Sequence, residues 1–209
     1  MQDKTLYALR ETIVGRLGEY RAKHVLSTEN EAAELAKIYI PHKEHDVRIS
    51  ALLHDITKEH STELQLQLLS DFGIMTDNVM LNSPKVFHAI TAPLIIKRDF
   101  PEYATDEILS SVRKHTTGSS DMSVFDCIIY LADYIEPGRT FSDCKELREY
   151  FWSGIKNCKG ERDKLMHLYK TMVLSFDLTI NNLVSEHCVI ASDTFSARNA
   201  FLMKISEEN

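Results

Sequence analysis

The stretch Ala51–Asp55 (ALLHD) closes an apolar run with two side chains that are common metal ligands. Val47, Ala51, His54 and Asp55 fall at positions i, i+4, i+7 and i+8, so they share one face of a helix. Because this face begins with apolar residues, we expect it to point into the core, where an unpartnered polar group costs roughly 2–7 kcal/mol. A metal ion suits both imidazole and carboxylate. The alternative is a surface His-Asp pair at a fraying helix end.

Composition limits the class of protein. The chain has 209 residues, of which 44% are hydrophobic, enough for one domain with a substantial core. Only seven glycines and five prolines occur, which favours long helices. A net charge of −7 argues against non-specific binding to nucleic acid or to an anionic membrane. The four cysteines form no CxxC pair, and we find neither a signal-like segment nor an apolar run of membrane length, so we expect a soluble cytoplasmic protein.

Helical periodicity recurs along the chain, and no segment alternates apolar and polar residues as a strand does. Pro41 ends one helix, Ser83-Pro84 begins another, and Thr62 with Gln65 fits a capping box. The expected helices cover residues 6–17, 20–39, from 44 through the His-Asp doublet, from 61 or 62, 83–100, 105–115, 122–135, 165–183 and from 193 or 194, with a loop at 73–81. The sequence therefore predicts an all-α, single-domain fold.

Four more ionisable residues take inward positions on these helices. His115 and Asp133 end apolar stripes, His88 begins one, and His24 lies on the apolar side of its helix. Each histidine alone also fits a hydrogen-bonded core residue, whereas a buried aspartate almost always has a partner. Together with the His54-Asp55 doublet they place metal-type ligands on the core faces of five helices, so we predict a metal centre.

The predicted ligand set contains four imidazoles and two carboxylates, which are too many for one cation and suit two. The set is rich in nitrogen and has no sulfur, which favours iron, manganese, zinc or cobalt over magnesium or calcium. Asp55 has two oxygens and can bridge the two cations. Such a pair lowers the pKa of a water held between them, and the resulting hydroxide can attack phosphorus.

Longer strings around these residues resemble the HD-domain metallophosphohydrolase superfamily, and more closely its YqeK family of bacterial symmetrical diadenosine tetraphosphate (Ap4A) hydrolases. The matching strings are ALLHD followed by Lys58, HTTG at 115–118 and LADYIEPGR at 131–139. The similarity runs from about Arg21 to the last helix. Ser27, Thr28 and Ala89 depart from the family pattern, but none of them is a predicted ligand.

This resemblance implies one HD domain over residues 1–209, with a core at about 20–140 on which the N-terminal helix and the C-terminal helices pack. It also implies two groups of ligands. The first group is His24, His54, Asp55 and Asp133, and the second is His88 and His115 with Asp55. The resemblance implies iron as the native metal, whereas the residues alone leave iron, manganese, zinc and cobalt open.

Cationic and hydroxyl side chains near the ligands are candidates for binding phosphate. Lys58 lies one helical turn beyond His54, and Arg139 follows the helix of Asp133, although they also fit a solvated lysine and a helix-capping cation. Arg21 is a weaker candidate, and Thr116 and Thr117 lie in a turn that can receive phosphate or be only a turn. The predicted catalytic residues are Asp55, Lys58 and Arg139, and the predicted substrate contacts are Arg21, Lys58, His88, His115, Thr116, Thr117 and Arg139.

The resemblance implies an acid-anhydride hydrolase that cuts Ap4A symmetrically into two ADP through metal-activated hydroxide. Alternatives are another HD phosphohydrolase acting on nucleoside tri- or monophosphates, a non-catalytic nucleotide-binding regulator and an iron-binding helical protein. A homodimer is one of the assemblies left open. Thr194, Arg198 and Asn199 either touch the nucleotide or cap the last helix, and we favour capping.

Overall fold

A computed structural model describes residues 2–75 and 78–207 of the chain, and every regular element in these ranges is helical. The all-α prediction is therefore confirmed. In chain order the elements are α1 (Gln2–Arg16), α2 (Glu19–Tyr39), η1 (Pro41–Lys43), α3 (Glu44–Leu53), α4 (Thr62–Asp71), α5 (Asn78–Leu81), η2 (Pro84–Val86), α6 (Phe87–Asp99), η3 (Pro101–Tyr103), α7 (Asp106–Lys114), α8 (Val124–Ile135), α9 (Ser142–Ile155), α10 (Glu161–Ser185) and α11 (Ser192–Glu207).

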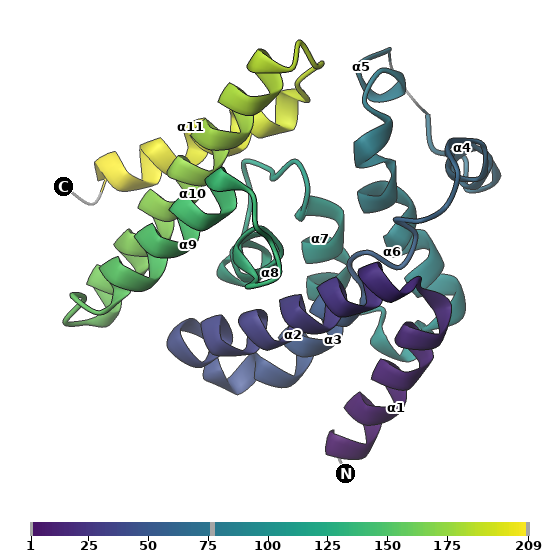
Figure 1. The fold of residues 1–209 in the computed structure, drawn as a ribbon, viewed down its shortest axis with the longest axis horizontal. Helices are drawn as coiled ribbons and strands as arrows, with labels where there is room; N and C mark the ends of the chain where they lie inside the picture. The colour runs from purple at the N-terminus through teal and green to yellow at the C-terminus, as the bar shows by residue number, and fades with distance from the viewer. Residues whose placement is uncertain (1, 76–77, 208–209) are drawn as a thin grey trace.

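Helix α8 lies at the centre of the fold. Its residues from Phe125 to Ala132 are all buried, as expected for a helix that is covered on every side. Helices α2, α3 and α7 pack against it from the N-terminal half, and α9 and α10 pack against it from the C-terminal half. In Figure 1 the C-terminal helices α9, α10 and α11 form a group on one side of α8, while α1 lies against α2 and α3.

Several helix ends differ from the sequence predictions. The Thr62–Gln65 capping box is wrong, because Ser61 is the N-cap of α4 and accepts a hydrogen bond from the backbone N–H of Leu64. Gln65 instead donates to the carbonyl oxygen of Thr57 at 2.6 Å. The helix expected from residue 83 begins as the 3-10 turn η2, and its α-helical part starts only at Phe87.

One more predicted helix start is shifted by two residues, and two stretches contain a helix that the sequence did not predict. Helix α8 starts at Val124 rather than residue 122, because Ser123 and Asp126 form a reciprocal capping box. The predicted loop at 73–81 contains the short α5, and residues 76–77 lie outside the described residues. Helix α9 covers a stretch for which the sequence pattern predicted no element. None of the helices in the described parts of the chain is both long and apolar enough to span a membrane.

Candidate metal centre

The His-Asp doublet lies directly after α3 and is buried. Helix α3 ends at Leu53, so His54 is its C-cap and Asp55 occupies the following turn, one step beyond the expected helix. The side chain of His54 is fully buried, and Asp55 is only 2% exposed. The surface alternative is therefore excluded.

A first group of ligand atoms meets between α2, the doublet and α8. Nε2 of His24 lies 3.0 Å from Oδ1 of Asp133 and 3.6 Å from Oδ2 of Asp55. Nε2 of His54 lies 3.5 Å from the same Asp55 oxygen and 3.8 Å from Oδ1 of Asp133. Four atoms from three distant segments thus surround one point.

A second group gathers around the other oxygen of Asp55. Nε2 of His88, from α6, lies 3.3 Å from Oδ1 of Asp55. Nε2 of His115, directly after α7, lies 3.6 Å from that oxygen and 3.0 Å from Nε2 of His88. The two oxygens of Asp55 therefore lie nearest to different imidazoles, while His54, Asp55 and His115 also form one group of potential ligands whose atoms lie within 4.8 Å of one another.

The hydrogen bonds of the imidazoles leave Nε2 available for a cation. Nδ1 of His54 donates to the carbonyl oxygen of Ala51 at 2.7 Å, and Nδ1 of His115 donates to that of Val112 at 2.6 Å. A proton on Nδ1 leaves a lone pair on Nε2, which is the ligand form of histidine. The buried Nε2 atoms of His24 and His54 have no hydrogen-bond partner among the described residues. This donor set fits a transition metal, which would satisfy both atoms.

Glu136 orients the first histidine, a role that the sequence analysis did not assign. Its Oε1 accepts from Nδ1 of His24 at 3.1 Å, and its Oε2 accepts from the backbone N–H of Gly138 at 2.5 Å. A carboxylate behind a ligand histidine fixes the ring and makes its other nitrogen a better ligand. The signal was the glutamate in the LADYIEPGR string, which lies just after α8.

Neighbouring charges keep the carboxylates of the site ionised, and burial lowers the pKa of the His88 and His115 imidazoles so that these two stay neutral. Burial alone would raise the pKa of Asp55, but the neighbouring His54 and His115 hold it well below its usual value. Burial likewise opposes ionisation of Asp133, and the charge of Arg139 outweighs it and lowers that pKa. The pKa of His88 is lowered well below its usual value, mainly by burial and then by the adjacent His115. Burial lowers the pKa of His24 too, but the hydrogen bonds to Asp133 and Glu136 outweigh it and raise this pKa to about 9. His24 would therefore give up a proton when a cation binds, whereas the charged carboxylates and the neutral His88 are already in the binding form.

Three cations surround the ligands. Nη1 of Arg21 donates to Oδ2 of Asp55 at 2.5 Å, and Arg139 donates through Nη2 to Oδ1 of Asp133. Nζ of Lys58 lies 3.1 Å from Nε2 of His88, and burial lowers the pKa of this lysine. The structure thus brings all three predicted cations to the centre, and it excludes the solvated reading of Lys58.

The HTTG turn connects the centre to the C-terminal helices. Oγ1 of Thr116 lies 3.2 Å from Nε2 of His88, whereas Thr117 donates to the carbonyl oxygen of Gly118 at 3.2 Å. Gly118 has a φ of +69°, and a Cβ there would lie 2.6 Å from Cζ of Phe176 in α10. Glycine is therefore required by both the backbone conformation and the close approach of α10.

Comparison with known proteins assigns the family. Residues 21–138, more than half of the chain, match the HD domain. The chain belongs to the HD domain family. Curated symmetrical bis(5′-nucleosyl)-tetraphosphatases resemble this HD protein over most of its length. The Bacillus subtilis relative is 27% identical over 88% of this chain and 90% of its own, and the Staphylococcus aureus relative is 26% identical over 80% and 84%.

A solved structure resembles this HD protein as well. It is the predicted HD superfamily hydrolase involved in NAD metabolism from Clostridium acetobutylicum, with a TM-score of 0.79 and 28% identity over 94% of this chain and 96% of that chain. The match to the HD domain and the three curated tetraphosphatase relatives together show that this HD protein is a hydrolase.

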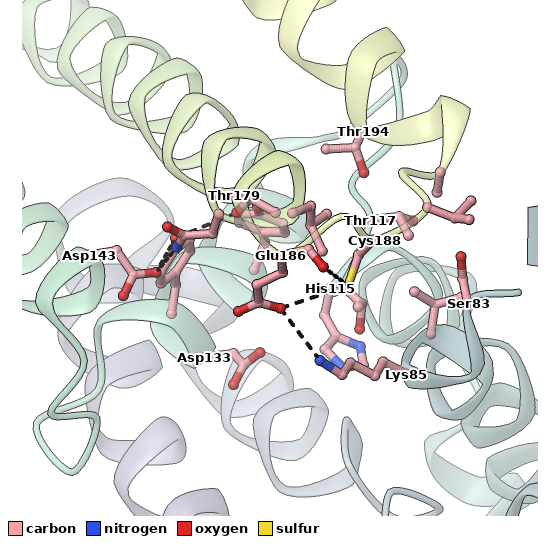
Figure 2. Close-up of a pocket in the computed structure, with 18 of the residues that line it drawn as sticks. Ser83, Lys85, His115, Thr117, Asp133, Asp143, Thr179, Glu186, Cys188 and Thr194 are labelled. Atoms are coloured by element: carbon pink, nitrogen blue, oxygen red, sulfur yellow. Dashed lines mark hydrogen bonds and ion pairs between the residues drawn. The ribbon is translucent and has the colours of Figure 1, made fainter.

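A pocket of about 630 Å³ opens onto the metal-type ligands of this HD protein. Figure 2 shows His115 and Asp133 in the pocket, with Asp143 to one side of Asp133 and Ser83 to the other. The remaining predicted residues that line it are Lys58, Thr116, Thr117, Arg139 and Thr194. It therefore lies beside both the ligands and the cations.

Of the three candidates of the last helix, Thr194, Arg198 and Asn199, only Thr194 lines the pocket. Thr194 is buried and lines the pocket, whereas Arg198 forms an ion pair with Asp177 and Asn199 is exposed. In the N-terminal half, Arg21 and His24 reach the ligand cluster without lining the pocket.

Proposed function

We propose that this HD protein cleaves Ap4A symmetrically to two ADP. The observation that carries the proposal is the convergence of four imidazoles and two carboxylates beside a pocket lined by Lys58 and Arg139. The activity named for three curated relatives, the symmetrical bis(5′-nucleosyl)-tetraphosphatases at 24–27% identity over most of the chain, supports this substrate. Cations beside such a ligand set suit a polyanionic substrate better than a metal store.

The proposed metal ligands divide around Asp55. His24, His54 and Asp133 would hold one divalent metal with Oδ2 of Asp55, and His88 and His115 would hold a second with Oδ1. When bound, such a pair supplies Lewis acidity and lowers the pKa of the water that attacks phosphorus. We propose iron, the metal that the family resemblance implies. The nitrogen-rich and sulfur-free set suits manganese, cobalt and zinc equally, and these are the alternatives to be tested.

The cations position the polyphosphate and offset its charge. Nε of Arg139 and Nε of Arg21 are buried donors without a hydrogen-bond partner in the described part of the chain. Arg139 lines the pocket, so its charge lies close to a phosphoryl oxygen bound there. Lys58 lies beside His88 at the same wall of the pocket and can stabilise negative charge that develops on the phosphoryl group. We propose Asp55, Lys58 and Arg139 as the catalytic residues.

The uncharged side of the pocket, formed by Thr116 and Thr117, would help to hold the phosphate chain in place. Thr116 and Thr117 line the pocket at the HTTG turn, and the hydroxyl of Thr116 lies beside His88. The pocket extends from the metal-type ligands to both Asp143 and Ser83 (Figure 2). A substrate with a nucleoside on each end of a phosphate chain needs space on both sides of the reacting phosphorus. This arrangement supports a dinucleotide substrate, and the symmetrical position of the cut rests on the relatives.

We propose the cytoplasm as the location, because all four cysteines are free and reduced thiols suit a reducing compartment. The assembly, with a homodimer as one candidate, is to be measured by light scattering.

The test is product analysis. Purified protein is incubated with Ap4A and Mn²⁺ or Fe²⁺, and nucleotides are separated by anion-exchange chromatography. We expect ADP alone from Ap4A, and no turnover by His54→Ala. Formation of ATP with AMP would contradict symmetrical cleavage. Faster turnover of ATP, AMP or NAD in a parallel panel would favour another HD phosphohydrolase, and tight binding of Ap4A without turnover would favour a regulator.

A further inference from the structure

Asp143 lies in the pocket at a junction of three helices. It belongs to the first turn of α9, and its Oδ2 accepts a hydrogen bond from the hydroxyl of Tyr134 in α8 at 2.8 Å. The same oxygen accepts from Nδ2 of Asn182 in α10 at 3.0 Å. Thr179 of α10 in turn lies 3.5 Å from the hydroxyl of Tyr134. All four residues line the pocket, so Asp143 is a fixed carboxylate on its wall (Figure 2).

The second oxygen of Asp143 is left without a donor. Oδ1 accepts no hydrogen bond from the residues that the structure describes, and no lysine or arginine of the described ranges forms an ion pair with it. An ionised carboxylate only accepts hydrogen bonds, so this wall of the pocket repels phosphate and suits a neutral group that carries hydroxyl donors. In a nucleotide that group is the ribose. A carboxylate that accepts from ribose hydroxyls is a recurrent solution in nucleotide-binding proteins.

Phe141 supplies an apolar surface next to this carboxylate. It is the N-cap residue of α9, two positions before Asp143, and its side chain lines the pocket although 64% of it is exposed. Exposed aromatic rings at the edge of a nucleotide pocket are stacking surfaces for bases. Arg139, two positions earlier, contacts Asp133 at the metal-type ligands. One short segment therefore carries a phosphate contact, an aromatic ring and an acceptor.

We propose that Asp143 and Phe141 form a nucleoside subsite, in which the ribose hydroxyls donate to Oδ1 of Asp143 and the base packs on Phe141. This inference rests on the proposed function for the identity of the substrate. It assigns one half of the dinucleotide to the side of the pocket next to α9 and α10. The negative charge of Asp143 disfavours phosphate next to its own side chain, and the phosphates would lie beside Lys58 and Arg139.

The experiment compares ADP with 2′,3′-dideoxyadenosine 5′-diphosphate in calorimetric titrations of Mn²⁺-loaded protein. Wild type should bind ADP about tenfold tighter, the loss expected for removing hydrogen bonds to a charged acceptor. Asp143→Ala should bring the ratio to about one. Asp143→Asn should shrink it, because the Tyr134 and Asn182 donors hold the amide oxygen in the Oδ2 position and leave the NH₂ facing the pocket. Glu146→Gln, an exposed residue of the same helix outside the pocket, should keep the ratio of wild type.

The stacking contact has its own variant and control. Phe141→Ala should lower the affinity for both nucleotides equally, by about tenfold. Tyr7→Ala, an aromatic residue of equal exposure on α1, should leave both unchanged. An unchanged ratio in both Asp143 variants, or equal binding of the two nucleotides by wild type, would refute the ribose contact whether or not Ap4A is cleaved. Discrimination by wild type that Asp143→Ala abolishes supports the subsite even if the products of Ap4A are not two ADP.

Discussion

Nε2 of His24 lies 3.0 Å from Oδ1 of Asp133, yet this buried nitrogen has no hydrogen-bond partner in the described ranges of the chain. The two atoms lie within ion-pair distance without meeting the geometry of a hydrogen bond. Nε2 of His54 shares this feature, 3.8 Å from the same oxygen. Burying unsatisfied polar atoms is unfavourable, and a bound cation would accept their lone pairs.

Removal of the metal is therefore expected to destabilise the protein. A ligand present at 100 times its dissociation constant stabilises the folded state by about 2.7 kcal/mol. For a chain of this size we expect chelator-treated protein to melt roughly 5–10 °C lower, with recovery on addition of Mn²⁺. Differential scanning calorimetry measures the shift, and His54→Ala should show little response to chelator. Equal melting temperatures with and without chelator in the wild type would oppose the metal site.

Glu136 tests whether the hydrogen bond behind His24 matters. Glu136→Gln removes the charge that orients the ring, and we expect metal affinity to fall about 10–100-fold, the usual cost of losing such a partner. Competition with a fluorescent chelator measures the affinity. The exposed Glu102→Gln provides a matched control that should bind metal like the wild type. Unchanged affinity in Glu136→Gln would mean that the contact is only structural.

Arg139 should separate metal binding from substrate use. The side chain contacts Asp133 but is not a predicted ligand, so Arg139→Ala should retain its metal. Loss of a charge-assisted contact to phosphate should lower kcat/KM for Ap4A by roughly 10–100-fold. Arg98→Ala, at an exposed position on α6, should leave both quantities unchanged. Wild-type kinetics in Arg139→Ala would restrict this arginine to holding Asp133.

The sequence revealed the metal-type ligands because each one interrupts an apolar pattern at helical spacing. His88 and Asp133 lie on the core-facing sides of α6 and α8. The periodicity that predicted these helices therefore also predicted that the two side chains point inward. The same periodicity predicted the long α10. The sequence pattern was sufficient to predict a metal-type ligand wherever an ionisable side chain occupied a buried position of a periodic helix.

Features that depend on contacts between distant segments could not be predicted in this way. Helix α9 buries Cys144, Leu147 and Phe151, a stripe of three residues among many charges, and its packing against α10 is fixed by the tertiary structure. The capping box at Thr62 and Gln65 was predicted wrongly because the side chain of Gln65 donates a hydrogen bond to the carbonyl oxygen of Thr57, which lies in the preceding turn. The role of Glu136 depends on His24, which lies in α2 at the other end of the HD domain sequence.

Glu31 should make stability depend on pH. Its pKa is raised, mainly by burial, while Trp152 donates to it at 2.8 Å. A raised folded-state pKa favours the protonated form, so its contribution to stability is greatest in acid and is lost as the pH rises through the folded-state pKa. Glu31→Gln keeps an acceptor for Trp152 without the buried charge, and it should be more stable than wild type at pH 8.

The advantage of Glu31→Gln should shrink as the pH falls toward 4.5, the ordinary value for glutamate. Urea unfolding at several pH values measures it. Glu34→Gln, on the exposed face of α2, should change stability by no more than about 0.5 kcal/mol at any of them. A Glu31→Gln variant that is less stable than wild type at pH 8 would contradict this reading.

The bridging role of Asp55 is tested most directly by metal content. Wild type and Asp55→Ala are purified without chelator, and their metals are counted by inductively coupled plasma mass spectrometry. We predict about two transition-metal ions per chain in the wild type and a large loss of both in Asp55→Ala, because each oxygen of Asp55 faces one group of imidazoles. Metal-free wild type, or Asp55→Ala with its full metal content, would contradict the account.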